Sequence, residues 1–149
     1  MYDEIWRQAE GYNAALAQQG IRWTLDDEAL AEYGRQLDPG GTGIMGYIEI
    51  PRIDCSLPIY HGTSDSVLQI AIGHIAGSSL PVGGESTHAV LSGHRGLPSA
   101  KLFTNLDQLE VGDLFMLEVL NEVLSYEVDQ ILIVMPHEVA TLAIEHGED

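Results

Sequence analysis

Residues 43–51 have the sequence GIMGYIEIP, and this stretch decides the class of fold. Ile48 and Ile50 alternate with Glu49, which predicts a β-strand with one buried face and one face in water. From this stretch onward the chain changes to short β-branched and aromatic runs separated by turn residues. The region that follows is therefore expected to be built mainly from β-strands.

Working outward toward the C-terminus, the same alternation of apolar runs and turn residues predicts several further strands. We expect them at residues 57–60, 88–92, 114–120, 123–128 and 130–135, with a short segment at 141–144. Helical turns are predicted at 65–72 and 99–106. Because the strands are short and long helices are few, a β-barrel is favoured over a parallel α/β sheet.

Toward the N-terminus the pattern is helical. In residues 2–19, apolar side chains recur at spacings of three and four, as in an amphipathic helix. A second short helix is predicted around Leu25–Tyr33, with three carboxylates near its positive N-terminal end. The sequence DPGG at 38–41 then breaks the chain. We therefore divide the chain into an N-terminal helical segment, 1–42, and a β-domain, 43–149.

Composition narrows the classes of function. The 149 residues fit one domain, and the formal net charge of −17 makes binding to nucleic acid improbable because phosphates are repelled. The single cysteine, Cys55, has no partner for an internal disulfide and is expected to be a small packing residue. No apolar run approaches the length of a membrane helix, so the chain is expected to be soluble, with any anchor outside it.

Histidine is the residue type that most invites a search for chemistry here. The spacing of His61, His74 and His88 matches no usual zinc site, and we expect neither a metal nor a cofactor. His94 differs because it follows an apolar strand and lies between Gly93 and Arg95. Such a strand end is where a rigid scaffold presents a reactive group, although a turn residue with a local hydrogen bond fits the pattern equally well.

Four stretches of this chain resemble class C (pilus-assembly) sortases. They are GIMGYIEIP at 43–51, LPIYHGT at 57–63, GHIAGSSLPVGG at 73–84 and LSGHRGLPSAKLF at 91–103, with looser similarity over 112–136. The resemblance implies an eight-stranded barrel on the outer face of a Gram-positive membrane, anchored outside these residues. It also implies a transpeptidase whose cysteine cleaves a Leu-Pro-any-Thr-Gly-type sorting signal between Thr and Gly, after which a pilin lysine resolves the thioacyl enzyme.

By the same resemblance His94 is the catalytic histidine, an acid for the leaving amine and a base for the incoming one. The family's nucleophile and arginine follow the strand that matches 130–135, so they are expected beyond Asp149. Cys55 matches no catalytic position, and residues 1–149 alone are expected to be an incomplete, inactive barrel. Asp38-Pro39 is followed by Gly40, which departs from the Asp-Pro-aromatic plug of many class C lids.

Two other functions stay open at this point. One is a sortase-like module that binds sorting peptides or pilins without cleaving them, and the other is a housekeeping sortase that anchors proteins to the cell wall. The partners expected in each case are sorting-signal peptides of pilins or surface proteins. We also expect the apolar stretch 130–135 to promote self-association if it forms an exposed strand edge.

Overall fold

A computed structural model of the chain describes residues 2–19, 25–93 and 105–132. Two helices come first, α1 (Tyr2–Gln19) and α2 (Asp27–Arg35). Six strands and three short helical turns follow. They are β1 (Ile44–Ile50), η1 (Pro51–Ile53), β2 (Cys55–His61), α3 (Asp65–Leu68), β3 (Ile72–His74), β4 (Leu91–Ser92), η2 (Leu106–Gln108), β5 (Leu114–Val119) and β6 (Glu122–Glu127).

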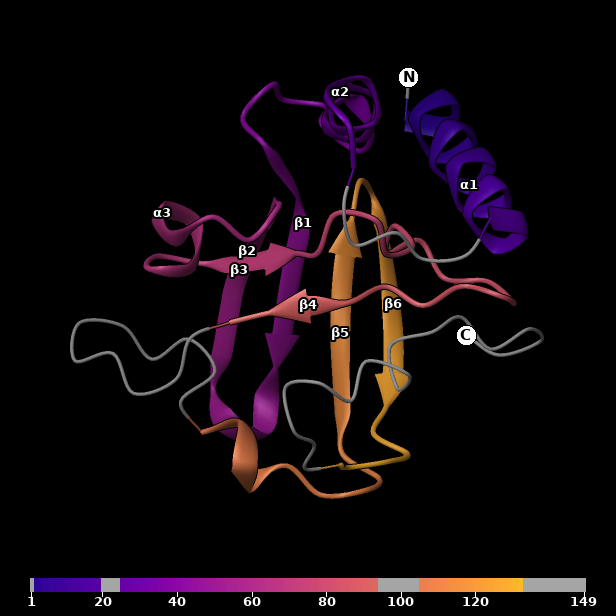
Figure 1. Cartoon of the computed structure of the whole chain (residues 1–149). Coiled ribbons are helices and arrows are strands. Elements are labelled where there is room, and N and C mark those ends of the chain that lie inside the picture. The colour runs from indigo at the N-terminus through magenta and orange to yellow at the C-terminus, as the bar shows by residue number, and fades with distance from the viewer. Residues whose placement is uncertain (1, 20–24, 94–104, 133–149) are drawn as a thin grey trace.

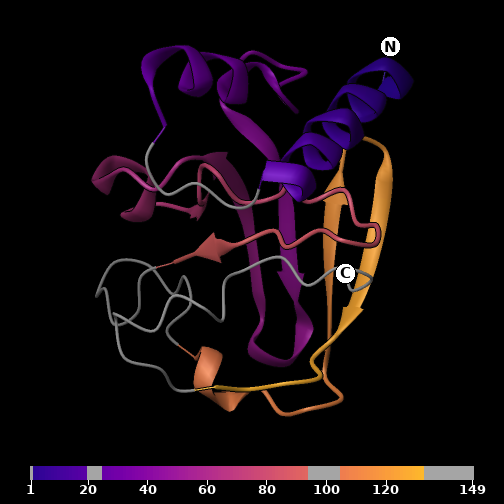
Figure 2. The same ribbon diagram turned by 45° about the vertical axis from the view of Figure 1, so that its right-hand side comes forward.

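The six strands form one curled sheet in the order β4-β3-β2-β1-β5-β6. All neighbours are antiparallel except β2 and β3, which run parallel with α3 in the connection between them. Figures 1 and 2 show β3 and β4 turned across the direction of β1 and β5, so the sheet forms a half-barrel. Both helices lie at the upper end of this sheet in Figure 1. The expected mainly-β fold with N-terminal helices is confirmed.

The core occupies the concave face of the half-barrel. In β1, Ile48 and Ile50 are buried while Tyr47 and Glu49 are exposed, as the alternation of apolar and polar residues predicted. The buried residues of the neighbouring strands, Ile59 in β2 and Leu117 in β5, join them in one apolar cluster. Burial of such side chains contributes about 1.5–3 kcal/mol each, and it fixes the register of the sheet.

Helix α2 begins at its acidic residues, as the sequence predicted. The Asp26 side chain caps the helix by accepting a hydrogen bond of 2.8 Å from the backbone N–H of Ala29. Asp27 and Glu28 lie in the first turn, where the helix dipole favours negative charge. The cap and the charges together fix the start of α2, and with it the place of Tyr33 on the buried side of the helix.

Two predicted elements need correction. One or two helical turns were expected at residues 65–72; α3 forms one over Asp65–Leu68, but Ile72 opens strand β3, whose three residues are buried. Of the strand predicted at 88–92, only Leu91–Ser92 pairs in the sheet. The backbone N–H groups of His88 and Val90 are bonded to serine hydroxyls, so this segment runs beside the sheet.

The remaining predicted elements lie after β4. Residues 130–132 were predicted to begin a strand, yet they are in no strand, and Ile131 and Leu132 are exposed. A strand needs a neighbour, and no strand of the described residues pairs with them. The predicted elements at 99–104, 133–135 and 141–144 lie outside the described residues. No helix of the described ranges is long and apolar enough to cross a bilayer.

Candidate active site

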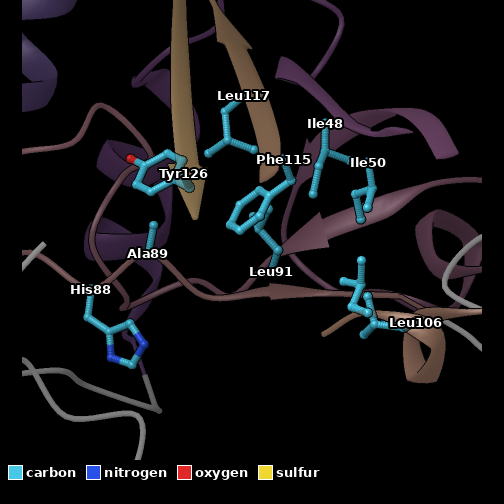
Figure 3. Close-up of a pocket in the computed structure, with 10 residues that line it drawn as sticks. Ile48, Ile50, His88, Ala89, Leu91, Leu106, Phe115, Leu117 and Tyr126 are labelled. Carbon is cyan, nitrogen blue, oxygen red and sulfur yellow. The ribbon is translucent and has the colours of Figure 1, made fainter. Parts of the chain in front are cut away.

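An apolar cavity of about 310 Å³ opens on the concave face of the half-barrel. Its floor is formed by residues that alternate inward along β1, β5 and β6, and its wall by the segment that leads into β4. The residues lining it are Ile48, Ile50, His88, Ala89, Leu91, Leu106, Leu109, Phe115, Leu117 and Tyr126. Figure 3 shows Phe115 and Tyr126 facing Ala89 and Leu91 across this space. A volume of this size suits a small apolar group of a ligand.

Aromatic rings form one side of the cavity. Phe115 of β5 and Tyr126 of β6 are cross-strand partners, and their rings stack with centroids 5.4 Å apart and planes inclined by 14°. Such a pair is favourable by about 0.5–1.5 kcal/mol beyond its buried area. The two rings therefore give this part of the cavity floor a fixed shape.

Strand β4 carries the chain toward His94, the predicted catalytic residue. Leu91 and Ser92 pair with His74 and Gly73 of β3, and Ser92 precedes His94 by two positions. Gly73 is required at this point because an added Cβ would lie 2.3 Å from the carbonyl oxygen of Gly62. His94 and Arg95 themselves lie outside the described residues, so the role of His94 stays a prediction.

The strand beside β4 contains a buried histidine that the sequence had suggested only as a possible metal ligand. His74 is fully buried in β3, and burial lowers its pKa to about 4, against the opposing hydrogen bond to Ser79. The ring is therefore neutral at pH 7 and carries one hydrogen. Its Nε2 lies 2.6 Å from the carbonyl oxygen of Ser79, which only accepts, so the hydrogen is on Nε2.

The other ring nitrogen of His74 receives a hydrogen bond from helix α2. The hydroxyl of Tyr33 lies 2.8 Å from Nδ1 and 3.1 Å from the carbonyl oxygen of His74, and because neither atom has a hydrogen the hydroxyl donates to both, with Nδ1 the nearer acceptor. The same oxygen accepts from the backbone N–H of Gly62 at 3.1 Å. Burial raises the pKa of Tyr33 well above its usual value, and the hydrogen bond from Gly62 opposes this rise only in part. Tyr33 is thus a permanent neutral donor.

Two serines connect His74 to the segment before β4. Ser78 and Ser79 are fully buried, and their hydroxyl oxygens accept from the backbone N–H of Val90 at 3.2 Å and of His88 at 2.8 Å. Ser78 also lies 3.1 Å from Nε2 of His74 and donates to the carbonyl of Ile75 at 2.7 Å. These serine hydroxyls therefore fix the backbone of the cavity wall.

The N-terminal helical segment is attached to the sheet at other points as well. Asn13 of α1 bonds both the carbonyl and the N–H of Leu80, at 2.9 and 2.6 Å. The ring nitrogens of His61 lie 2.9 Å from the carbonyl oxygen of Gly43 and 2.5 Å from that of Gln36. Sequence reasoning missed these contacts, although Asn13 on the buried face of α1 was a signal that could have been used.

Cys55 lies at the start of β2, where it is 7% exposed and belongs to the apolar core. Burial raises the pKa of its thiol, and the nearby charge of Asp54 raises it further. Since a nucleophilic cysteine needs an accessible thiolate, the surroundings of Cys55 favour packing over catalysis. Within the described ranges, no three His, Cys, Asp or Glu side chains gather as metal ligands would.

Comparison with known proteins identifies the family. Residues 48–149 match the family model of the sortase domain, which is more than half of the chain, so the chain belongs to the sortase family. Sortase D of Bacillus subtilis (strain 168) is 32% identical over 104 residues, covering 70% of this chain and 50% of that protein. The chain thus spans about half the length of this curated relative.

Solved structures place it beside the class C sortases. Sortase C1 of Streptococcus agalactiae is 49% identical, with a TM-score of 0.95 over 98% of this chain and 76% of that one. Sortase C of Streptococcus pneumoniae is 43% identical, with a TM-score of 0.84 over 97% of this chain and 73% of that one. Sortase A of Corynebacterium diphtheriae, as a lid mutant, is 38% identical with a TM-score of 0.91 over 97% and 78%. The resemblance stated from the sequence is confirmed.

Proposed function

We propose that this chain is the histidine-bearing part of a class C sortase that joins pilin subunits. The observation that carries the proposal is the match to sortase C1 over 98% of the chain at 49% identity, together with the motif that contains His94. The substrate is a Leu-Pro-any-Thr-Gly-type sorting signal, and the acceptor is a lysine amine of a pilin. The work is done on the outer face of a Gram-positive membrane.

The proposed reaction has two steps. A cysteine thiolate attacks the threonine carbonyl carbon, and the bond to the glycine nitrogen breaks as His94 gives that nitrogen a proton. The lysine amine then attacks the thioester, His94 takes a proton from it, and an amide forms as the thiolate leaves. Cys55 is buried in β2, so another cysteine of the protein would supply the thiolate.

The described residues have two roles in this proposal. The segment 88–92, held by Ser78 and Ser79, directs the chain toward His94. The apolar cavity beside it offers a surface for the apolar part of the sorting signal. Neither role needs a metal or a cofactor, since the proposed reaction is nucleophilic and acid–base chemistry.

Two alternative functions differ from this proposal. One uses another acceptor amine, and the other binds the sorting peptide without turnover. The names of the relatives include sortase A and sortase D as well as sortase C, which favours keeping a housekeeping sortase as the second candidate. That enzyme would transfer the same thioacyl group to an amine of the cell-wall peptide. A non-catalytic module would bind the sorting peptide and release it intact.

The test is made on the protein encoded by the complete gene. It is incubated with a sorting-signal peptide and an equal mixture of two acceptors, a lysine-containing pilin peptide and a cell-wall peptide amine, and the products are identified by mass spectrometry. We expect the pilin conjugate to dominate. His94→Ala should lower turnover by about 10²–10⁴-fold, whereas Cys55→Ala should leave it within a few-fold. Preference for the wall amine indicates the housekeeping enzyme, and intact peptide with measurable binding indicates the binding module.

A further inference from the structure

The contact between α2 and β3 goes beyond what the proposed reaction requires. Tyr33 and His74 are 41 positions apart, yet their side chains meet at 2.8 Å in a buried setting. From this contact a continuous set of hydrogen bonds leads to the backbone of His88 and Val90. That backbone forms the cavity wall and continues into β4.

We propose that Tyr33 and His74 are positioning residues that couple the N-terminal helical segment to the strand leading to His94. The part of this inference that concerns turnover rests on the proposed function, because the proposed function assigns the catalytic role to His94. The physical basis is the single hydrogen of the neutral imidazole. Tyr33 donating to Nδ1 and Ser79 accepting from Nε2 both select the same tautomer.

The consequence of losing the Tyr33 hydroxyl follows from this tautomer. Nδ1 would be left buried without a donor, which is costly. The ring cannot relieve this by moving its hydrogen to Nδ1, because Nε2 would then present a lone pair to the carbonyl oxygen of Ser79 at 2.6 Å. Either Ser79 or the ring must shift, so a change on α2 is transmitted to the 78–79 turn.

The turn passes any such shift to the cavity wall. The hydroxyl of Ser78 is saturated, since it donates to Ile75 and lies within hydrogen-bond distance of Nε2 of His74 and of the N–H of Val90. Backbone bonds reinforce the connection, from Ser79 N–H to the His88 carbonyl at 3.0 Å and from Ile75 N–H to the Val90 carbonyl at 2.9 Å. A displaced turn therefore displaces residues 88–90 with it.

The coupling is measured by amide hydrogen exchange, followed by NMR, on the chain itself. In Tyr33→Phe we expect the amides of His88 and Val90 to exchange about tenfold faster than in the wild type. Tyr47→Phe is the matched control, because Tyr47 is 48% exposed on β1 and the same atom is removed. Equal exchange of these two amides in both variants would overturn the proposal. Nitrogen chemical shifts of the His74 ring report its tautomer in the same samples.

A second variant covers the case in which Tyr33→Phe does not fold. Ser78→Ala removes the hydroxyl that Val90, Ile75 and Nε2 of His74 share, so Val90 should exchange faster. The carbonyl oxygen of Ser79 is left in place, so the His74 ring keeps its hydrogen on Nε2. Ser125→Ala, in the exposed part of β6, is its control. Unchanged exchange at Val90 in Ser78→Ala would equally contradict the coupling.

Kinetics on the complete gene product separate positioning from stability. The folded fraction is first measured by circular dichroism, so that unfolded molecules do not lower the apparent rate. Per folded molecule, Tyr33→Phe should lower kcat by on the order of 10–10²-fold with KM nearly unchanged, because misplacement of a catalytic group acts on the transition state. If the wild type is active and Tyr33→Phe has the same kcat, this inference is contradicted and the proposed function is not. An inactive wild type with the expected exchange pattern contradicts the proposed function alone.

Discussion

Asn13 and Leu80 exchange two hydrogen bonds across 67 positions of sequence. The amide group of Asn13 serves the backbone of Leu80 as a strand neighbour would, donating to its carbonyl and accepting from its N–H at 2.6 Å. Both residues are buried, Leu80 completely. Helix α1 is thereby attached to the loop that follows β3, next to the serines that hold the cavity wall.

Replacement of Asn13 by alanine should be strongly destabilising. It leaves the N–H of Leu80 buried without its acceptor, while the carbonyl keeps the hydrogen bond from the N–H of Val82 at 2.8 Å, and we expect the free energy of unfolding to fall by about 1–3 kcal/mol. Urea denaturation followed by circular dichroism measures it. Asn121→Ala, at an exposed turn residue, is the control and should change stability by less than about 0.5 kcal/mol. Similar losses in both variants would show that the Asn13 contacts contribute little.

Two glycine-to-alanine changes should have opposite effects. In Gly73 the new methyl group would lie 2.3 Å from the backbone oxygen of Gly62, so we expect a loss of about 3 kcal/mol. In Gly11 of α1 nothing lies within 4 Å of the new atom, and the substitution should stabilise the helix by about 0.5–1 kcal/mol. Thermal denaturation of the two variants tests this. A Gly73→Ala protein as stable as Gly11→Ala would contradict the close approach of Gly73 to the backbone of Gly62.

Stability should depend on pH through His74. Its pKa is about 4 in the folded protein against 6.5 ordinarily, so between these values the unfolded chain binds a proton that the folded protein excludes. The free energy of unfolding contributed by this group is full above pH 6.5 and falls by up to about 1.4 kcal/mol per unit as pH drops toward 4. Urea titrations at pH 7, 6 and 5 should show a shallower slope in His74→Gln. Parallel curves for the two proteins would exclude His74 as the cause.

Cys55 should behave as an inert core residue. Its thiol is buried with a raised pKa, so reaction with a disulfide reagent at pH 8 should be slow in the folded protein and fast in urea. Cys55→Ala should cost about 1 kcal/mol of stability, the typical effect of a small truncation. Rapid labelling of the native protein, with no change in rate on unfolding, would count against the packing role.

Self-association should increase with salt. Strand β6 is paired on one side only among the described strands, and Val123, Ile131 and Leu132 are 63%, 54% and 55% exposed. The net charge of −17 opposes contact between copies, and salt screens this repulsion. Size-exclusion chromatography from low to high ionic strength should show a growing oligomer fraction, reduced in Ile131→Lys. A monomer peak that stays the same at every salt concentration would show that these side chains do not drive association.

The local pattern of the sequence was sufficient for elements that follow a clear period. Helix α1, the capped helix α2 and the alternating strand β1 all lie where predicted, because their burial repeats every 3.6 or 2 residues. Strand β3 was missed because it has only three residues, Ile72, Gly73 and His74, and all three are buried, so no alternation of buried and exposed residues indicates a strand. Its strand character comes from pairing with β2 and β4.

The candidate site could be predicted only in part from the local sequence pattern. The motif around His94 identified the family, but the role of His94 stays a prediction. The contacts that hold the neighbouring strand join Tyr33 to His74 and His88 to Ser79, residues separated by 41 and 9 positions. A single sequence does not show which distant polar groups meet. What it does show is that each of them is a residue able to donate or accept when buried.

The order of strands also bears on how the protein is made. Strand β1 lies in the middle of the sheet between β2 and β5, and β5 is encoded far downstream of it. During synthesis the β1–β2 hairpin emerges first, with the free edge of β1 exposed to other nascent chains until β5 arrives. Pairing over so long a loop is slow. Chaperoning of this protein therefore has to protect one particular backbone edge, that of residues 44–50, until residues 114–119 have been synthesised.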